Sequence, residues 1–556
     1  MKKFLVIFLM ALSTVCIGQD VLVDTMTAEL NRNFKVLRKQ NPAIYYMSYY
    51  IEDRDSYSAS ASLGDLASER AIHDRTLNVD ARAGSRKLDN THEFKDDYED
   101  TLSLRNYMVP VENDPAALKN IMWRATQEEA QKAQDQFLKV KTNDGVTAAS
   151  KDDSDDFSAA PKPVKYYAPV KKAEKLDRAA LKEELKKYSA IMTKYPFLLD
   201  SYVSFDYTTT NKYIVTSEGV SIVEGRDMIR LSYTLNTRNE DGMELSRYNA
   251  YNGFAMADMP AVEQVEKDIL KDIGHLQALQ NAPVVEPFTG PVILKNRASG
   301  VFFHEILGHR VEGHRQKSES FGQTFTSKVG EQVVSPIISV YDDPSLSHYN
   351  GTPLRGFYTY DDEGVKAQKA AIIEHGVLKG FLMGRSPIKN FKNSNGHGRK
   401  EIGSRAVSRM GNTIVEAQNP VPFDTLKQML KDEIKKQNKP YGLIIEDISG
   451  GFTMIDRNNP QSFKVTPLLV YRVYPDGRAD EIVRGVDIVG TPLTSFSKIL
   501  GAADDVEVFN GNCGAESGWV PVSAVSPSIL IGELEVEKVN KSAQKLPILP
   551  NPVEAK

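Results

Sequence analysis

The sequence predicts an α+β fold, in which a mixed N-terminal α/β domain precedes a largely antiparallel β C-terminal domain that carries a kinked metal-binding helix. Length is the first reason, because 556 residues suffice for two domains with separate cores. Helical periodicity and long alternating runs share the first half of the chain, whereas short apolar runs dominate the second half. We place the N-terminal domain at residues 19–290 and the C-terminal domain at residues 291–556.

The N-terminal domain is predicted to begin with a helix over residues 24–40, followed by an aromatic strand over residues 43–51. A long helix follows Asp114, and its expected apolar side consists of Ala116, Leu118, Ile121 and Met122. The remaining pattern predicts a helix over residues 176–194, strands within 202–251, and a charged amphipathic helix over 262–280.

A polar insertion interrupts this domain at about residues 142–175. The segment is rich in proline, alanine and lysine, and it contains an acidic run at residues 152–156. Such a composition offers little apolar surface to bury, so we expect a mobile linker or a surface insertion.

The C-terminal domain is predicted to open with a buried strand at residues 291–294, which leads into the metal-binding helix. Short strand-like runs follow at residues 333–341, 370–382, 441–448, 468–474 and 529–536. Many short strands of this kind favour a largely antiparallel sheet.

The segment with the clearest chemistry is His304-Glu305-Ile306-Leu307-Gly308-His309. Imidazoles are good zinc ligands, and a carboxylate beside them can take a proton from a water molecule that the metal activates. The pattern therefore predicts a metallohydrolase, with His304 and His309 as ligands and Glu305 as the general base.

The spacing of the two histidines requires a distorted helix. Residues five apart on a regular helix are displaced by about 140°, so both cannot reach one metal ion. A π-bulge would bring them into line, and Gly308 is where a backbone distortion costs least. We expect a kinked or π-bulged helix here.

A catalytic zinc usually has three protein ligands, so one more is needed. Glu312 and His314 lie nearby, and Cys513 lies far away in the sequence. Cys513 is favoured, because the only other cysteine, Cys16, lies in a segment that we expect to be removed. The glycines around Cys513 predict a tight turn that approaches another segment closely. Glu312 and His314 are then expected to support the site rather than to bind the metal.

These segments together resemble the TldD/PmbA family of metallopeptidases. The metal motif is residues 300–313 (GVFFHEILGHRVEG), and the cysteine segment is residues 512–522 (NCGAESGWVPV). Residues 360–364 (YDDEG), with the hairpin at residues 373–380, and residues 395–399 (NGHGR) resemble two further conserved blocks of that family. The resemblance covers residues 200–540, with all blocks in the family's order.

The resemblance implies zinc bound by His304, His309 and Cys513, and Glu305 as general base. It also implies a peptidase of the motif-bearing TldD type that acts on unfolded or small peptides. The partner would be a second copy of the chain or a TldE/PmbA-like subunit that lacks the motif. The polar insertion and the export signal described below depart from the family pattern, so no physiological substrate is carried over.

The scissile carbonyl needs a hydrogen-bond donor as well as the metal. Arg310, His397 and Arg399 are candidates, and each is equally suited to a structural hydrogen bond. An extended peptide is expected to lie against an exposed strand edge, near residues 450–452.

Residues 1–18 are predicted to be a secretory signal peptide, with Lys2 and Lys3 before an apolar run that is too short to span a membrane well. The mature chain is expected to be periplasmic or secreted. Cys16 leaves a lipoprotein as the weaker alternative, because the residues before it form a poor lipidation site.

The whole chain has a formal net charge of −5 and no basic tract, which argues against a nucleic-acid-binding function. No segment after the signal is long and apolar enough to span a membrane. Two rival functions stay open at this point. One is a binding or assembly protein with a structural metal site, and the other is a zinc amidase acting on a non-peptide substrate.

Overall fold

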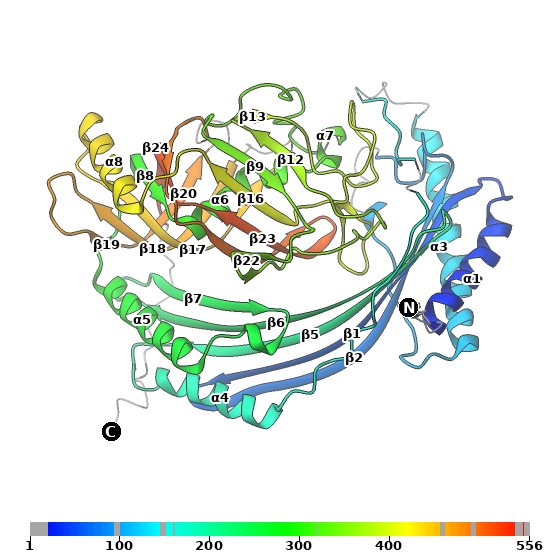
Figure 1. Cartoon of the computed structure of the whole chain (residues 1–556), viewed down its shortest axis with the longest axis horizontal. Coiled ribbons are helices and arrows are strands. Elements are labelled where there is room, and N and C mark those ends of the chain that lie inside the picture. The colour runs from blue at the N-terminus through cyan, green and yellow to red at the C-terminus, as the bar shows by residue number, and fades with distance from the viewer. Residues whose placement is uncertain are drawn as a thin grey trace, which may run out of the picture.

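The computed structural model describes residues 20–93, 101–144, 152–159, 162–318, 320–455, 457, 462–490, 496–539 and 549. The expected signal peptide at residues 1–18 lies outside these described residues. The chain folds into a long curved sheet that cradles a second, sheet-rich domain (Figure 1). This confirms the predicted α+β fold class.

The curved sheet of the N-terminal domain has the order β3-β2-β1-β5-β6-β4, and β7 pairs with β6. Its strands are β1 (Ile44–Ser62), β2 (Asp65–Ala83), β3 (Tyr107–Met108), β4 (Lys165–Tyr167), β5 (Tyr202–Thr216), β6 (Ser221–Arg238) and β7 (Glu244–Gly253). Apart from the parallel pair β4–β6, these strands are antiparallel. The concave face of the sheet is turned toward the C-terminal domain (Figure 1).

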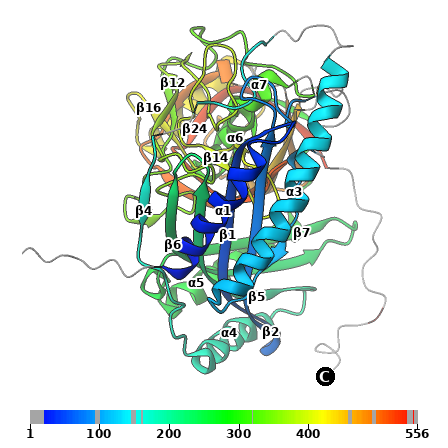
Figure 2. The ribbon, with the colours of Figure 1, turned by 90° about the vertical axis from the view of Figure 1, so that its right-hand side faces the viewer.

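Four helices cover the convex side and one end of this sheet. They are α1 (Val21–Leu37), α3 (Pro115–Asp144), α4 (Arg178–Met192) and α5 (Val262–Asn281), and a short 3₁₀ turn, η1, spans Met256–Asp258. Helices α4 and α5 lie beneath the sheet, and α1 lies beside α3 at its far end (Figures 1 and 2). All four helices were predicted, because each buries residues at helical spacing, as Leu118 and Met122 do in α3. Ala116 is exposed, so the apolar side of α3 begins later than we expected.

The polar insertion is only partly a surface segment. Asp156, Phe157 and Ser158 are buried, and the guanidinium groups of Arg82 and Arg385 each lie 3.9 Å from the centre of the Phe157 ring. Lys165–Tyr167 forms strand β4. The expectation of a mobile linker or surface insertion is therefore wrong for residues 156–158, because Arg82 and Arg385 of the folded body pack against the Phe157 ring.

The C-terminal domain contains two main sheets, of which the first has the order β13-β12-β9-β16-β23-β22. Its strands are β9 (Ile338–Asp342), β12 (Ala370–Glu374), β13 (Val377–Leu378), β16 (Asn412–Ala417), β22 (Glu507–Ala515) and β23 (Gly518–Ser526). Two small hairpins accompany it, made by β10 (His348–Tyr349) with β11 (Thr352–Pro353) and by β14 (Gly398–Arg399) with β15 (Val407–Ser408).

The second sheet has the order β17-β8-β24-β20-β18-β19, and β21 pairs with β24. Its strands are β8 (Phe288–Leu294), β17 (Gly442–Met454), β18 (Ser462–Val473), β19 (Glu481–Val483), β20 (Val486–Gly490), β21 (Ile499–Ala502) and β24 (Ile529–Lys538). Only the pairs β16–β23 and β8–β17 are parallel among the described strands of this domain. The prediction of a largely antiparallel domain is confirmed.

Helix α6 (Asn296–Ile306) is packed among these strands and is buried along nearly its whole length. Phe302 contacts Phe463 and Phe496 edge to face, and Phe303 stacks on Phe496, so aromatic packing fixes the helix that carries the metal motif. The short elements η2 (Gly308–Val311) and α7 (His314–Lys317) follow.

Helix α8 (Phe423–Lys436) was not predicted, although its buried residues Leu426, Leu430 and Ile434 recur every four positions. Within the described part of the chain, no helix is long and apolar enough to cross a membrane.

Candidate metal centre and its cleft

The metal motif lies where helix α6 ends. His304 is in the last turn of α6, Leu307 follows the helix, and His309 is in the 3₁₀ turn η2. The Leu307 N–H still donates to Phe303 O at 3.0 Å, but the Arg310 N–H donates to Leu307 O at 2.9 Å, which is a tighter turn. The helix is therefore kinked, as predicted, but by a break into a 3₁₀ turn rather than by a π-bulge. The change of direction brings the two histidine rings to a centroid distance of 5.1 Å.

Two contacts hold this break in place. Arg310 Nη1 donates to the carbonyl oxygens of Glu305, at 3.0 Å, and of Ile306, at 3.2 Å, so acceptors freed at the helix end are satisfied. A Cβ on Gly308 would overlap the Sδ of Met410. Gly308 is thus required for a close approach, and not for an unusual backbone angle.

Cys513 reaches the two histidines from strand β22. Its Sγ lies 3.3 Å from His309 Nε2, and the nearest donor atoms of His304, His309 and Cys513 are all within 4.8 Å of one another. All three side chains are buried. The tight turn that we expected at Cys513 falls slightly later, between Ala515 and Gly518, so the thiol projects from the strand before the turn.

The chemistry of these three side chains fits zinc. Burial alone disfavours charge on each of them, but the nearby histidines lower the pKa of the Cys513 thiol well below its usual range. Against the same burial, the thiolate and Glu312 raise the pKa of His309 to about 10. The site thus holds a thiolate beside imidazoles that retain protons, and a divalent cation can replace those protons. Two imidazole nitrogens and one thiolate would supply three protein ligands, the number that is usual for a catalytic zinc.

Glu312 orients His309 from behind. Its carboxylate has no exposed surface, lies 3.3 Å from His309 Nδ1, and accepts a hydrogen bond of 2.7 Å from Arg315 Nε. Despite burial, His309 and Arg315 lower the pKa of Glu312 to about 2. A carboxylate that receives Nδ1–H leaves Nε2 free to face the metal, which is the supporting role expected for Glu312.

His314 belongs to a neighbouring polar network. Its Nε2 hydrogen-bonds to Glu516, which also accepts a bond of 2.6 Å from Arg315 Nη2. Arg409, which is fully buried, donates to Cys513 O at 2.7 Å and lies 3.4 Å from Glu312. Arg409 and Glu516 were not found from the sequence, because no local pattern distinguishes them from other charged residues.

The three expected carbonyl donors lie outside the cleft wall formed by described residues. Arg310 braces the helix end, as given above. His397 is fully buried, with its Nε2 3.2 Å from Asp342 and its Nδ1 2.8 Å from Asn395 Oδ1. Arg399 donates to Met410 O at 2.6 Å. All three are placed as structural hydrogen-bonders.

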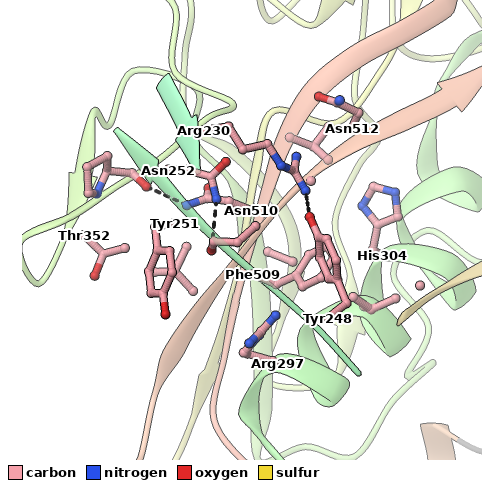
Figure 3. Close-up of a pocket in the computed structure, with 18 of the residues that line it drawn as sticks. Arg230, Tyr248, Tyr251, Asn252, Arg297, His304, Thr352, Phe509, Asn510 and Asn512 are labelled. Atoms are coloured by element: carbon pink, nitrogen blue, oxygen red, sulfur yellow. Dashed lines mark hydrogen bonds between the residues drawn. The ribbon is translucent and has the colours of Figure 1, made fainter. Parts of the chain in front are cut away.

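A cavity of about 720 Å³ opens beside the metal residues, between the curved sheet and the C-terminal domain. His304 and Glu305 line it together with residues of β6, β7, β17 and β22 (Figure 3). Gly450 and Gly451 are in its wall, as the sequence led us to expect. A Cβ on Gly451 would lie only 2.8 Å from Glu305 Cγ, so this glycine lets β17 pass directly over the expected base.

Residues 288–538 match the family model described as the PmbA/TldA metallopeptidase C-terminal domain. The chain is 28% identical over 337 residues to the metalloprotease TldD homologue of Haemophilus influenzae, which covers 59% of this chain and 65% of that protein. The crystal structure of TldE from Thermococcus kodakarensis has a TM-score of 0.61 at 15% identity, covering 92% of this chain and 100% of that one. The chain belongs to the TldD/PmbA family.

Another relative of this TldD/PmbA member is the zinc metalloprotease TldD homologue of Saccharolobus solfataricus, at 24% identity over 357 residues, or 63% of this chain and 73% of that protein. The names of these relatives point to a metallopeptidase and to a metal. The chain spans less than two thirds of the length of its Haemophilus relative, and the likeness to TldE is one of fold.

Proposed function

We propose that this TldD/PmbA member is an exported zinc metallopeptidase that hydrolyses peptide bonds in small or unfolded peptides. His304, His309 and Cys513 would hold the zinc, and Glu305 would act as general base. The observation that carries the proposal is the convergence of these three donors beside Glu305 at a cleft of about 720 Å³.

When bound, zinc supplies a Lewis acid that polarises the scissile carbonyl and makes a water molecule easier to deprotonate. Glu305 takes the proton from the attacking water and returns it to the leaving amine. Gly451 closes over Glu305 and restricts its side chain, while Arg310 holds the backbone of the same residue. Glu312 keeps the His309 ring in one orientation.

The peptide would lie extended along β22, the strand that carries Cys513. In the described part of the chain, β22 pairs only with β23, and Phe509, Asn510 and Asn512 line the cleft. Main-chain hydrogen bonds to such an edge give little sequence preference, which suits a peptidase of unfolded chains.

A structural metal site is the first rival, and it would usually have four protein ligands. Within the described residues the donor cluster contains three, and His314, whose participation would favour a structural site, is bonded to Glu516 instead. This arrangement favours a catalytic site. A zinc amidase acting on non-peptide substrates is the second rival, and a substrate panel separates it from a peptidase.

The test combines metal content with turnover. Mature protein purified without chelator is expected to contain about one zinc per chain by mass spectrometry, and the Glu305→Gln variant should keep that zinc and lose peptide hydrolysis. Glu374→Gln is the matched control, because Glu374 is exposed on β12 and does not line the cleft. Wild-type protein without metal would overturn the proposal. Unchanged turnover in Glu305→Gln would remove the assigned base.

Export and assembly belong to the same proposal. The apolar segment at residues 4–12 supports a periplasmic or secreted mature chain, and N-terminal sequencing of the protein from cell fractions tests it. The fold similarity to TldE supports assembly either with itself or with a TldE/PmbA-like subunit. Light scattering of the purified chain, alone and with such a subunit, distinguishes the two.

A further inference from the structure

A row of polar and charged side chains crosses the curved sheet beside the cleft. In the strand register, Arg230 of β6 lies between Asp206 of β5 and Asn252 of β7. Arg226 lies four residues before Arg230 on the same strand, so both project from the same face. Arg230 and Asn252 line the cavity together with His304 (Figure 3).

Arg355 joins this row from the C-terminal domain. Its Nη1 donates to Asn252 Oδ1 at 2.8 Å, and its Nη2 donates to Asn512 Oδ1 at 3.0 Å. Asn512 is the residue before Cys513, so Arg355 links the sheet to the strand that brings the thiol. Both of these hydrogen-bond partners are neutral amides, and Arg355 forms no ion pair within the part of the chain that the structure describes.

The arginines here are not neutralised by the protein. Within the described residues, no ion pair involves Arg226, Arg230, Arg297 or Arg355, although Asp206 is a cross-strand neighbour of Arg230. Arg230 donates to the Tyr248 hydroxyl, and Arg226 donates to Phe357 O at 2.8 Å. Burial is the main cause that lowers the pKa of Arg355 to about 9, and the positive charges of Arg230 and Arg226 add to this effect, whereas Asp206 opposes it.

The acidic groups near the row do not cancel this charge. Asp258, which also lines the cleft, accepts the backbone N–H groups of Phe254, at 2.7 Å, and Ala255, at 2.9 Å. Glu305 faces the metal residues. Arg297, another lining residue, lies 6.0 Å from the Phe509 ring. Asp206 is the cross-strand neighbour of Arg230, and Glu507 interacts electrostatically with Arg297. Within the described residues, four guanidinium groups thus stand against two acids that form no ion pair, in a chain whose net charge is −5.

We propose that Arg230, which lines the cleft, binds a carboxylate of the peptide substrate and thereby sets which peptides enter. Arg355 does not line the cleft itself, but it is bonded to the lining residues Asn252 and Asn512 and adds positive charge at the same place. This inference rests on the proposed peptidase function. Guanidinium groups bind carboxylates through paired, charge-assisted hydrogen bonds, which are stronger than bonds between neutral groups. The carboxylate is either the C-terminus of a short peptide or the side chain of an Asp or Glu residue. Main-chain contacts to β22 would fix the backbone, and the arginines would fix the position along the strand.

The test is a binding measurement that does not depend on turnover. Zinc-loaded Glu305→Gln protein is titrated against three fluorescently labelled peptides of one sequence. The first has a free C-terminus, the second a C-terminal amide, and the third an amide with one internal Gln replaced by Glu. Anisotropy is expected to show about tenfold tighter binding of at least one carboxylate peptide than of the neutral amide. The free-acid and Glu peptides identify which source of carboxylate is bound.

Variants in the same background decide whether the arginines cause the preference. Arg230→Gln and Arg355→Gln should remove most of it, and Arg355→Lys, which keeps the charge, should retain part of it. Arg478→Gln is the control, because Arg478 is exposed and pairs with Asp476 away from the cleft. Melting curves identify any variant that fails to fold, and Arg230→Gln then carries the test alone.

Equal binding of acid and amide peptides would overturn the carboxylate site, and so would a preference that survives Arg230→Gln. If wild-type protein cleaves unfolded chains under the same conditions, the peptidase function stands and only this inference fails. If wild-type protein neither binds nor cleaves any peptide, both fail together.

Discussion

The Nδ1 atom of His309 lies 3.3 Å from a carboxylate oxygen of Glu312, a side chain with no exposed surface. The two residues are three positions apart, on either side of the end of the 3₁₀ turn, and Arg315 and Arg409 hold the carboxylate from its other sides. The orientation of one metal ligand therefore depends on a buried charged network, in which Arg409 also bonds to the backbone of Cys513, a second expected ligand.

Glu312→Gln is expected to weaken zinc binding by about 10- to 100-fold, because the amide accepts the His309 proton less strongly and removes the buried negative charge that faces Arg315 and Arg409. Competition with a zinc chelator measures the change. Glu374→Gln, at an exposed position, should leave the affinity as it is. Wild-type affinity in Glu312→Gln would show that Glu312 does not orient His309.

Gly308→Ala is expected to destabilise the fold by about 1–3 kcal/mol and to weaken zinc binding, because the new Cβ overlaps the Sδ of Met410. The double variant Gly308→Ala/Met410→Ala restores the room and should recover part of the metal affinity. Thermal melts and metal content measure both effects. If the second substitution recovers nothing, then the glycine is needed for another reason.

Gly451→Ala is expected to lower kcat by about 10- to 100-fold with zinc retained, because its Cβ would lie 2.8 Å from Glu305 Cγ and displace the general base. Gly274→Ala is the control. A Cβ on Gly274, within α5, meets no atom within 4 Å, so this change should stabilise the helix by about 0.5–1 kcal/mol and leave kcat unchanged. Full activity in Gly451→Ala would argue against a base held by this contact.

Glu363 should make the fold less stable as the pH rises. Burial raises its pKa to about 7, above the value of about 4.3 expected in the unfolded chain. The stabilisation is therefore complete below about pH 4.3 and is lost as the pH rises through 7. Urea unfolding should show that Glu363→Gln loses less stability than the wild type between pH 5 and pH 8. Equal losses in the two proteins would contradict the raised pKa.

Local patterns were enough for most elements of the fold. Helices α1, α3, α4 and α5 bury residues at helical spacing. This spacing lies within each helix, so the helices can be predicted without information from distant segments. Helix α8 shows the same spacing at Leu426, Leu430 and Ile434 and was nevertheless missed. The buried residues of the polar insertion were beyond prediction, because Phe157 is held by arginines from two distant segments, Arg82 and Arg385.

By itself, the sequence determined the candidate chemistry. His304, Glu305 and His309 lie within one short segment, and the cysteine content singled out Cys513. Tertiary structure decided how these groups meet, because the contact between Gly308 and Met410 and the packing of α6 select a break into a 3₁₀ turn over a π-bulge. It also decided the surroundings of the site. Distant strands and loops supply Glu516, Arg409, Arg230 and Arg355. Their roles depend on whether an oppositely charged side chain lies beside them, and spacing along the chain does not encode that.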